Sequence, residues 1–226
     1  MKTTPNVLHF DEAISWFRHR LESAGYLPDV EGMLKDLEKE AGAVAATAQL
    51  DLATAVYEGL DEAISKGTTF NDFRQRIIDV LNISWGAQAP NVETSPRLDA
   101  IFRTNVQRSY NAGRIEQYRQ PDILATRPYW KFSAILDGRT SELCQACAGV
   151  IRPADDAWWE THQPPLHHRC RSTVIAMSKR AGEAVGVTED PPEGEVPEGF
   201  GNVEREFRPK LSEYPRALAK EYKGPR

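Results

Sequence analysis

The sequence predicts an α+β protein, in which an N-terminal helical bundle precedes a small α+β module with a short antiparallel sheet. In the N-terminal part, apolar side chains recur at the three- and four-residue spacing of amphipathic helices. After Pro128 the pattern changes to short aromatic or β-branched runs between turn residues, which is typical of strands. All three cysteines of the chain fall between Asp137 and Arg171, within this second part.

The N-terminal part contains several helical patterns in succession. Ile14, Phe17 and Leu21 lie on one face of the first predicted helix, which Asp11 is suited to cap. Residues 30–66 are rich in Ala, Leu, Glu and Lys and fit either one long helix or two. This part is therefore expected to form a bundle that binds other proteins.

A further helix is expected after Gly67, because glycine commonly ends a helix and Thr68 or Thr69 is suited to cap the next one. The buried face of this helix is predicted to consist of four apolar side chains: Phe70, Phe73, Ile77 and Leu81. Residues 86–96 combine Gly, Pro, Asn and Ser and predict a linker.

Residues 97–120 predict another helix, which carries a row of arginines. Arg97, Arg108 and Arg119 are spaced by eleven residues, about three turns, so that they align on one face. Such a row could contact the phosphates of a nucleic acid. It could also be a solvated face that pairs with acidic residues of the first helices, and this second reading is preferred because charge rows on helices are usually solvated.

Three short strands are expected in the second part, at residues 129–136, 149–152 and 172–177. Beyond Lys179 the chain is rich in Pro, Gly and Glu, so a mobile tail is expected, with a basic C-terminus that is either a docking arm or a plain disordered end. The predicted organisation has three parts: a helical region (1–90), an α+β module (91–180) and this tail (181–226).

Composition excludes several classes of protein. The formal net charge of -5 argues against tight non-specific binding of nucleic acid, which depends on neutralising phosphates. No apolar run approaches the roughly 20 residues that span a bilayer, and no export signal is visible, so we expect no membrane partner. Without export, cysteines stay reduced, which favours metal binding or burial over disulfides.

The cysteines and one histidine form two pairs with the spacing of a metal site. Cys144 and Cys147 form a C-x-x-C pair, and His167 and Cys170 form an H-x-x-C pair after nineteen intervening residues. Zinc prefers four tetrahedral ligands drawn from thiolate and imidazole, and four protein ligands favour a structural site. His168 is the main alternative to His167 as the histidine ligand, and His162 is a weaker one.

Other interpretations of the cluster fit less well. A thioredoxin-like pair needs a helix that starts at its first cysteine, whereas a strand is expected directly after Cys147. A zinc deaminase needs an H-x-E element ahead of its cysteines, and the order here is reversed. Buried cysteines without metal remain an alternative. Trp158 and Trp159, in the loop between the pairs, are both expected to pack in the core. The alternative is that one of them packs on the sheet while the other is free to bind a ligand.

Five phrases in the same order resemble the family of phage Mu F-like head-morphogenesis proteins, the minor head proteins of tailed bacteriophages. The resemblance covers about residues 5–180 and rests on these phrases: FDEAISWFRHRL, EGLDEAISKGTTFNDFRQRI, RTNVQRSYNAGR, RPYWKF, and VIRPADDAWWETHQPP followed by Cys170 and Arg171. A related branch from phages of Gram-positive hosts has the D-x-R-T, C-x-x-C and PP-x-H-x-x-C-R pattern that this chain also shows, which supports zinc.

The resemblance implies a non-enzymatic virion component inside the capsid, assembled in the cytoplasm of a bacterial host. It implies association with the portal protein, contacts with the scaffold or the major capsid protein, a weak contact with phage DNA, and a part in procapsid assembly or in DNA packaging and delivery. Two alternatives remain: a toxin or processing enzyme on the same module, and a DNA-binding accessory protein that uses the arginine row.

Overall fold

The computed structural model describes residues 11–24, 46–85 and 95–202. The described residues form two compact units, which divide between residues 106 and 107. The division therefore falls inside a helix, 16 residues beyond the expected boundary at residue 90. The helix-rich chain with one small antiparallel sheet confirms the predicted α+β class.

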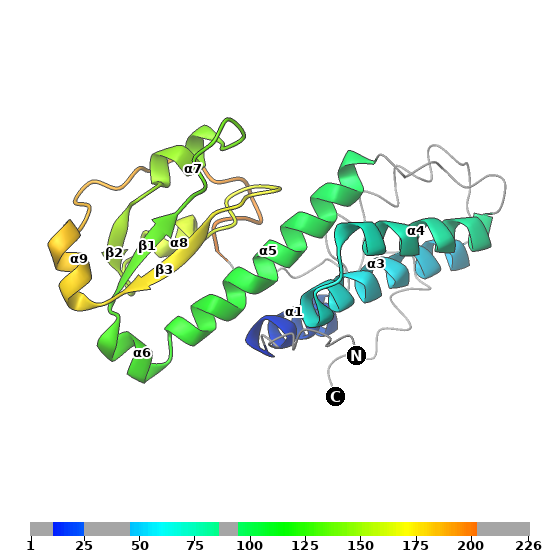
Figure 1. The fold of residues 1–226 in the computed structure, drawn as a ribbon, viewed down its shortest axis with the longest axis horizontal. Helices are drawn as coiled ribbons and strands as arrows, with labels where there is room; N and C mark the ends of the chain where they lie inside the picture. The colour runs from blue at the N-terminus through cyan, green and yellow to red at the C-terminus, as the bar shows by residue number, and fades with distance from the viewer. Residues whose placement is uncertain (1–10, 25–45, 86–94, 203–226) are drawn as a thin grey trace, which may run out of the picture. The chain divides into compact units, whose positions relative to one another are not determined.

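The first unit consists of helices, as the apolar spacing predicted. It contains α1 (Asp11–Ala24), α3 (Ala46–Lys66), α4 (Phe70–Trp85) and the first half of α5 (Pro96–Tyr118) (Figure 1). Five of the seven side chains expected to be buried in the first helix and in α4 are buried: Ile14, Phe17, Phe73, Ile77 and Leu81. Phe70 is half-buried, and the side chain of Leu21 lies outside the described residues. The question of one helix or two over residues 30–66 lies partly outside the described residues.

The turn between α3 and α4 follows the predicted signals. Gly67 ends α3 with a positive φ of 71°, and its N–H donates to the carbonyl of Ala63. Thr69 is the residue that caps α4: its hydroxyl accepts from Asp72 N, and the Asp72 carboxylate accepts from Thr69 N at 2.8 Å. Arg76 then pairs with Glu62 across the two helices at 2.8 Å.

The second unit is built on a three-stranded antiparallel sheet in the order β2-β1-β3 (Figure 1). Its strands are β1 (Tyr129–Ser133), β2 (Ile151–Pro153) and β3 (Thr173–Met177), and each overlaps a predicted strand. The register pairs Trp130 with Arg152 and with Ala176. Because the strands are short, the sheet needs packing against other elements to be stable.

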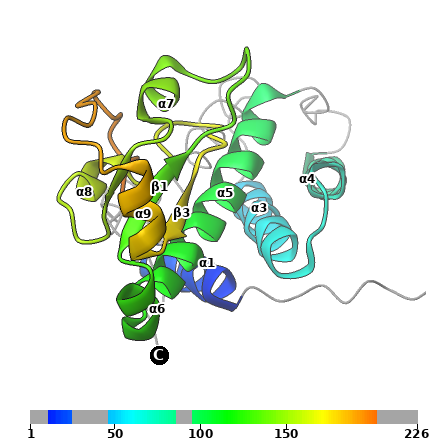
Figure 2. The same cartoon turned by 60° about the vertical axis from the view of Figure 1, so that its left-hand side comes forward.

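Alternation along β1 directs two aromatic side chains to one face. Trp130 and Phe132 are fully buried, and their rings pack edge-on against Trp159 and Trp158, with centroids 5.7 and 6.2 Å apart. Trp159 begins the short helix α8 (Trp159–His162), which lies beside the sheet (Figure 2). Both tryptophans are therefore part of the core, as expected.

Side chains of α5 satisfy carbonyl groups next to the outer edge of β3. Gln107 and Asn111 both donate to the carbonyl of Ser172, at 3.0 and 3.1 Å. Arg114 hydrogen-bonds the hydroxyl of Thr173. The second half of α5 is thus held by polar contacts to the strand end that follows the second cysteine pair.

Two further short helices complete the connections of the second unit. α6 (Pro121–Thr126) links α5 to β1, and α9 (Lys179–Val185) follows β3. Gly182 of α9 packs on Tyr129, where an added Cβ would lie 2.7 Å from the ring. None of the described helices combines the length and apolar character that crossing a bilayer needs.

Residues 186–202 are packed against the module, which differs from the tail expected from residue 181. Thr188 N donates to Ile151 O, so this segment pairs with the outer edge of β2. Trp158 Nε1 donates to Pro192 O at 2.9 Å. Prolines lack an N–H but keep a carbonyl acceptor, which explains how a Pro-rich run can be ordered without forming a strand. The basic C-terminus lies outside the described residues.

Gly201 fixes the end of this segment through hydrogen bonds and a close approach to the backbone of Thr161. It has a φ of 80° and exchanges backbone hydrogen bonds with Pro165 and Gln163. An added Cβ would lie 2.0 Å from the carbonyl oxygen of Thr161. Only glycine fits this close approach, so the segment depends on it.

We predict that Gly201→Ala releases residues 186–202, because the alanine both strains the backbone and collides with Thr161 O. Hydrogen exchange of Thr188 N should speed up and the melting temperature should fall. Gly199→Ala is the matched control: Gly199 has a φ of 84° and open space around its Cβ position. Equal effects of both substitutions would mean that backbone strain alone, about 1–2 kcal/mol, explains the loss.

Candidate metal centre

The first cysteine pair lies in a short helix between β1 and β2. α7 (Glu142–Cys147) begins after Ser141, whose hydroxyl accepts from Cys144 N at 3.2 Å and so caps the helix. A separation of three residues places Cys144 and Cys147 on the same side of a helix. Both side chains are buried.

The second pair lies in the turn before β3 and brings two more ligand atoms to Cys144. Cys144 Sγ lies 3.6 Å from Cys170 Sγ and 3.3 Å from His167 Nε2. Zn–S bonds of about 2.3 Å and Zn–N bonds of about 2.0 Å at a tetrahedral angle separate two sulfurs by about 3.8 Å and sulfur from nitrogen by about 3.5 Å. These three donors therefore fit a metal of that size.

Hydrogen bonds orient the His167 ring toward the cysteines. Its Nδ1 lies 2.8 Å from the carbonyl oxygen of His168, so Nδ1 carries the proton and Nε2 keeps its lone pair. Ser141 donates its hydroxyl proton to this Nε2 at 2.8 Å. A backbone carbonyl behind the ring is the usual support of a metal-binding histidine.

The two alternative histidines have other contacts. The His168 ring packs edge-on against Phe200, with centroids 4.8 Å apart. His162 is buried and stacks on Trp158 at 4.6 Å. Of the three histidines, His167 is the one whose ring the structure groups with the cysteines.

The thiols favour a cation through their mutual effects on ionisation. The hydrogen bond from Cys170 lowers the pKa of the Cys144 thiol, and the same contact together with burial raises the pKa of Cys170. The hydrogen bond to Cys144 raises the pKa of His167. The Cys144 thiolate is thus stabilised, whereas its negative charge disfavours ionisation of Cys170. A bound divalent cation would stabilise both thiolates.

Cys147 stands apart from the other three predicted ligands. Among the residues that the structure describes, the ligand atoms that lie within 4.8 Å of one another come from Cys144, His167 and Cys170. Burial, and then the nearby Cys144 thiolate, raise the pKa of Cys147 to about 12. Cys147 is absent from the converging group, so its role as the fourth ligand remains a prediction.

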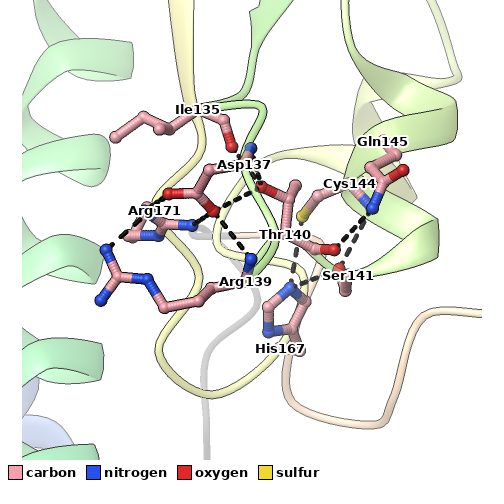
Figure 3. Close-up of polar contacts among 9 residues, drawn as sticks. All are labelled: Ile135, Asp137, Arg139, Thr140, Ser141, Cys144, Gln145, His167 and Arg171. Atoms are coloured by element: carbon pink, nitrogen blue, oxygen red, sulfur yellow. Dashed lines mark hydrogen bonds and ion pairs between the residues drawn. The ribbon is translucent and has the colours of Figure 1, made fainter.

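An ion pair ties the two halves of the site together. Arg171 follows Cys170 and donates through both terminal nitrogens to Asp137, at 2.8 and 2.6 Å (Figure 3). Asp137 also accepts from Arg139 N and lies in the turn that Thr140 closes just before α7. The pKa of Asp137 is held far below its usual range, mainly by Arg171.

Ser141 is the site residue that motif reasoning missed. Its hydroxyl caps α7 and also contacts His167, so it serves both halves of the centre. A serine three residues ahead of Cys144 is a recognisable capping signal, but α7 is too short for helical periodicity to reveal it.

The arginine row has a mixed environment. Arg97 is exposed in the first unit. Arg108 is buried, with its guanidinium 5.9 Å from the Phe200 ring centroid, and Arg119 lies over Trp130 at 5.8 Å. The burial of Arg108 weighs against its contact with phosphate. The role of all three in nucleic-acid binding stays a prediction.

The family model and the similar proteins identify the same family. Residues 54–175, more than half of the chain, match the family described as Phage Mu protein F like protein. Protein F of Escherichia phage Mu, whose name describes it provisionally as a capsid assembly protein, is 30% identical over 78% of this chain. The F protein of the Mu-like prophage FluMu in Haemophilus influenzae is 28% identical over 72% of it.

These relatives are longer proteins. The chain spans 42% of the phage Mu protein and 41% of the FluMu protein, so it corresponds to less than half of either. No solved structure matches the chain significantly. On the strength of the family match, which includes the sheet and the cysteine cluster up to β3, the chain belongs to the phage Mu protein F like family.

Proposed function

We propose that this chain is a structural component of phage head assembly. The observation that carries the proposal is the similarity to a capsid assembly protein over most of the chain, at 30% identity. The role requires no catalytic residue. Since the chain spans less than half of its relatives, the activities of those longer proteins are proposals here.

The finer role is that of a minor head protein at the portal vertex, inside the capsid, that takes part in procapsid assembly or in DNA packaging and delivery. Its helical first unit would bind the portal protein, with the scaffold or the major capsid protein as further partners. The second unit would serve as a compact body. Any contact with phage DNA would be weak, given the net charge of -5.

We predict that the full chain co-purifies with the portal protein of the same phage. Native mass spectrometry should show a defined number of copies on the portal ring. Leu60→Asp, which buries a charge in the first unit, should abolish the complex, whereas the exposed Ile83→Asp should leave that unit folded. A chain that stays monomeric beside assembled portal rings would contradict the portal role.

We also propose that the cysteine cluster holds a structural zinc ion. Cys144, His167 and Cys170 supply three donors that already converge, and rotation of the Cys147 side chain supplies the fourth. Bound zinc would neutralise the thiolates and join α7 to the turn before β3. The thiolate and imidazole donors of this cluster suit zinc better than magnesium or calcium, which prefer oxygen ligands.

We predict that Cys170→Ser removes the metal and lowers the melting temperature together, because metal binding and folding are coupled. His167→Ala should do the same, whereas His168→Ala, its matched control, should keep one zinc per chain. Atomic absorption and thermal melting with and without a chelator measure both effects.

Cys147→Ser distinguishes a site with four protein ligands, which includes Cys147, from a site with three. Weaker zinc binding supports the set of four protein ligands, and unchanged binding would refute that set. A wild-type chain that melts at the same temperature with and without the chelator would contradict the structural role of the metal.

We predict that Asp137→Asn weakens the centre from outside the ligand set, since it removes the acceptor of Arg171 and loosens the turn before α7. The melting temperature should fall at pH 7. The depressed pKa means that this contribution is present above the unfolded pKa of about 3.9 and is lost as the pH falls through the folded value.

The control for this prediction is Asp155→Asn, which removes an equal charge from an exposed carboxylate that bonds no described residue. Equal melting temperatures for Asp137→Asn and Asp155→Asn at pH 7 would show that the ion pair does not support the site.

A further inference from the structure

The strap, defined as residues 186–202, follows α9 and lies beside α8, where it contacts parts of the second unit that are distant in sequence (Figure 2). It begins at the edge of β2. Thr188 N donates to Ile151 O at 3.0 Å, and Ile151 N donates to Thr188 Oγ1 at 3.1 Å. No residue of the strap belongs to a helix or a strand. Separate contacts, and not a ladder, therefore hold it in place.

The middle of the strap contacts the helix that carries the first cysteine pair. A Cβ added to Gly194 would lie 2.5 Å from Leu143 Cδ1, so the backbone of the strap passes directly over this leucine. Leu143 is the residue before Cys144 in α7. The strap is therefore in direct contact with the first turn of α7.

The end of the strap contacts the turn that carries the second pair. Gly201 N donates to Pro165 O at 3.1 Å, and Gln163 N donates to Gly201 O at 2.7 Å, just ahead of that pair. The ring of Phe200 packs edge-on against the ring of His168, with centroids 4.8 Å apart. His168 lies within the second pair, so the strap contacts this turn on both sides of its histidine ligand.

These contacts connect the strap to both halves of the cysteine cluster. Cys144 and Cys170 are 2% and 3% exposed, so their sulfur atoms become accessible through local opening or through global unfolding. Local opening requires α7 and the turn before β3 to move apart, and the strap contacts both. Because separate contacts hold the strap while the sheet has ladders and a tryptophan core, release of the strap requires less free energy than global unfolding.

We propose that the strap controls access to the cysteine cluster. Its release lets α7 and the turn before β3 move apart, and this local opening sets the rate at which the thiols react and at which a bound metal ion leaves. The control of metal release rests on the zinc site proposed above, whereas the control of thiol access does not. Thiol and metal measurements therefore test the two proposals separately.

The test compares three rates in the full chain as purified, with its metal content measured. The first is alkylation of Cys144 and Cys170 by iodoacetamide, resolved by peptide mass spectrometry. The second is hydrogen exchange of Thr188 N, which reports release of the strap from β2. The third is hydrogen exchange of Phe132 N, which donates to Val150 O at 2.8 Å and reports opening of the sheet.

Two variants distinguish local opening from global unfolding. Gly201→Ala should speed alkylation of both thiols and exchange of Thr188 N by the same factor, about tenfold, because backbone strain and the collision with Thr161 O favour the open strap. Ile115→Val is the control. Ile115 is buried in α5, so the smaller side chain destabilises the second unit as a whole. It should speed exchange of Phe132 N and leave alkylation of the thiols unchanged.

Alkylation at the wild-type rate in Gly201→Ala, or faster alkylation in Ile115→Val, would overturn the proposal. In the zinc-loaded chain, transfer of the metal to the colorimetric chelator pyridylazoresorcinol should follow the same pattern, and equal transfer rates for the wild type and Gly201→Ala would also overturn it. A purified chain without zinc would contradict the proposed metal centre alone, because the thiol rates then decide whether the strap controls access.

Discussion

The meeting of α7 with the turn before β3 is the constraint on which the second unit depends. The sheet consists of strands of five, three and five residues, too few to be stable through their own ladders. The segments that meet at Cys144 and Cys170 flank β1 and β3. A link between them closes the loop that contains β2 and both tryptophans, which reduces the entropy that the unfolded chain gains.

Two kinds of bond make that link, and they differ in location. The sulfur and imidazole atoms of Cys144, His167 and Cys170 converge in the interior, whereas Asp137 and Arg171 pair at the surface. Ser141 connects them, because it starts α7 and touches His167. Metal coordination would supply most of the stability, while the ion pair and the serine fix the angle at which the two segments meet.

Sequence patterns recovered those features that depend on local chemistry. Gly67 and Thr69 predicted the α3–α4 turn, and turn residues around short β-branched runs predicted the three strands. Sequence patterns could not reveal that residues 186–202 pack on β2. The proline carbonyls of this segment accept hydrogen bonds only from residues that are distant in sequence, and no local pattern identifies those donors. They also could not separate Cys147 from the other ligands, because spacing defines the helix face but not the side-chain rotamer. Helical spacing could not predict the burial of Arg108 for a similar reason: Phe200, whose ring lies next to its guanidinium, is distant in sequence.

X-ray absorption at the zinc edge of the purified, metal-loaded chain tests the central claim most directly, because it counts the sulfur and nitrogen atoms around the ion. The proposed centre predicts three sulfurs at about 2.3 Å and one nitrogen at about 2.0 Å. A shell of oxygen and nitrogen atoms without sulfur would contradict a metal held by Cys144, Cys147 and Cys170, and would leave the second unit to be stabilised by its tryptophan core and the Asp137–Arg171 pair.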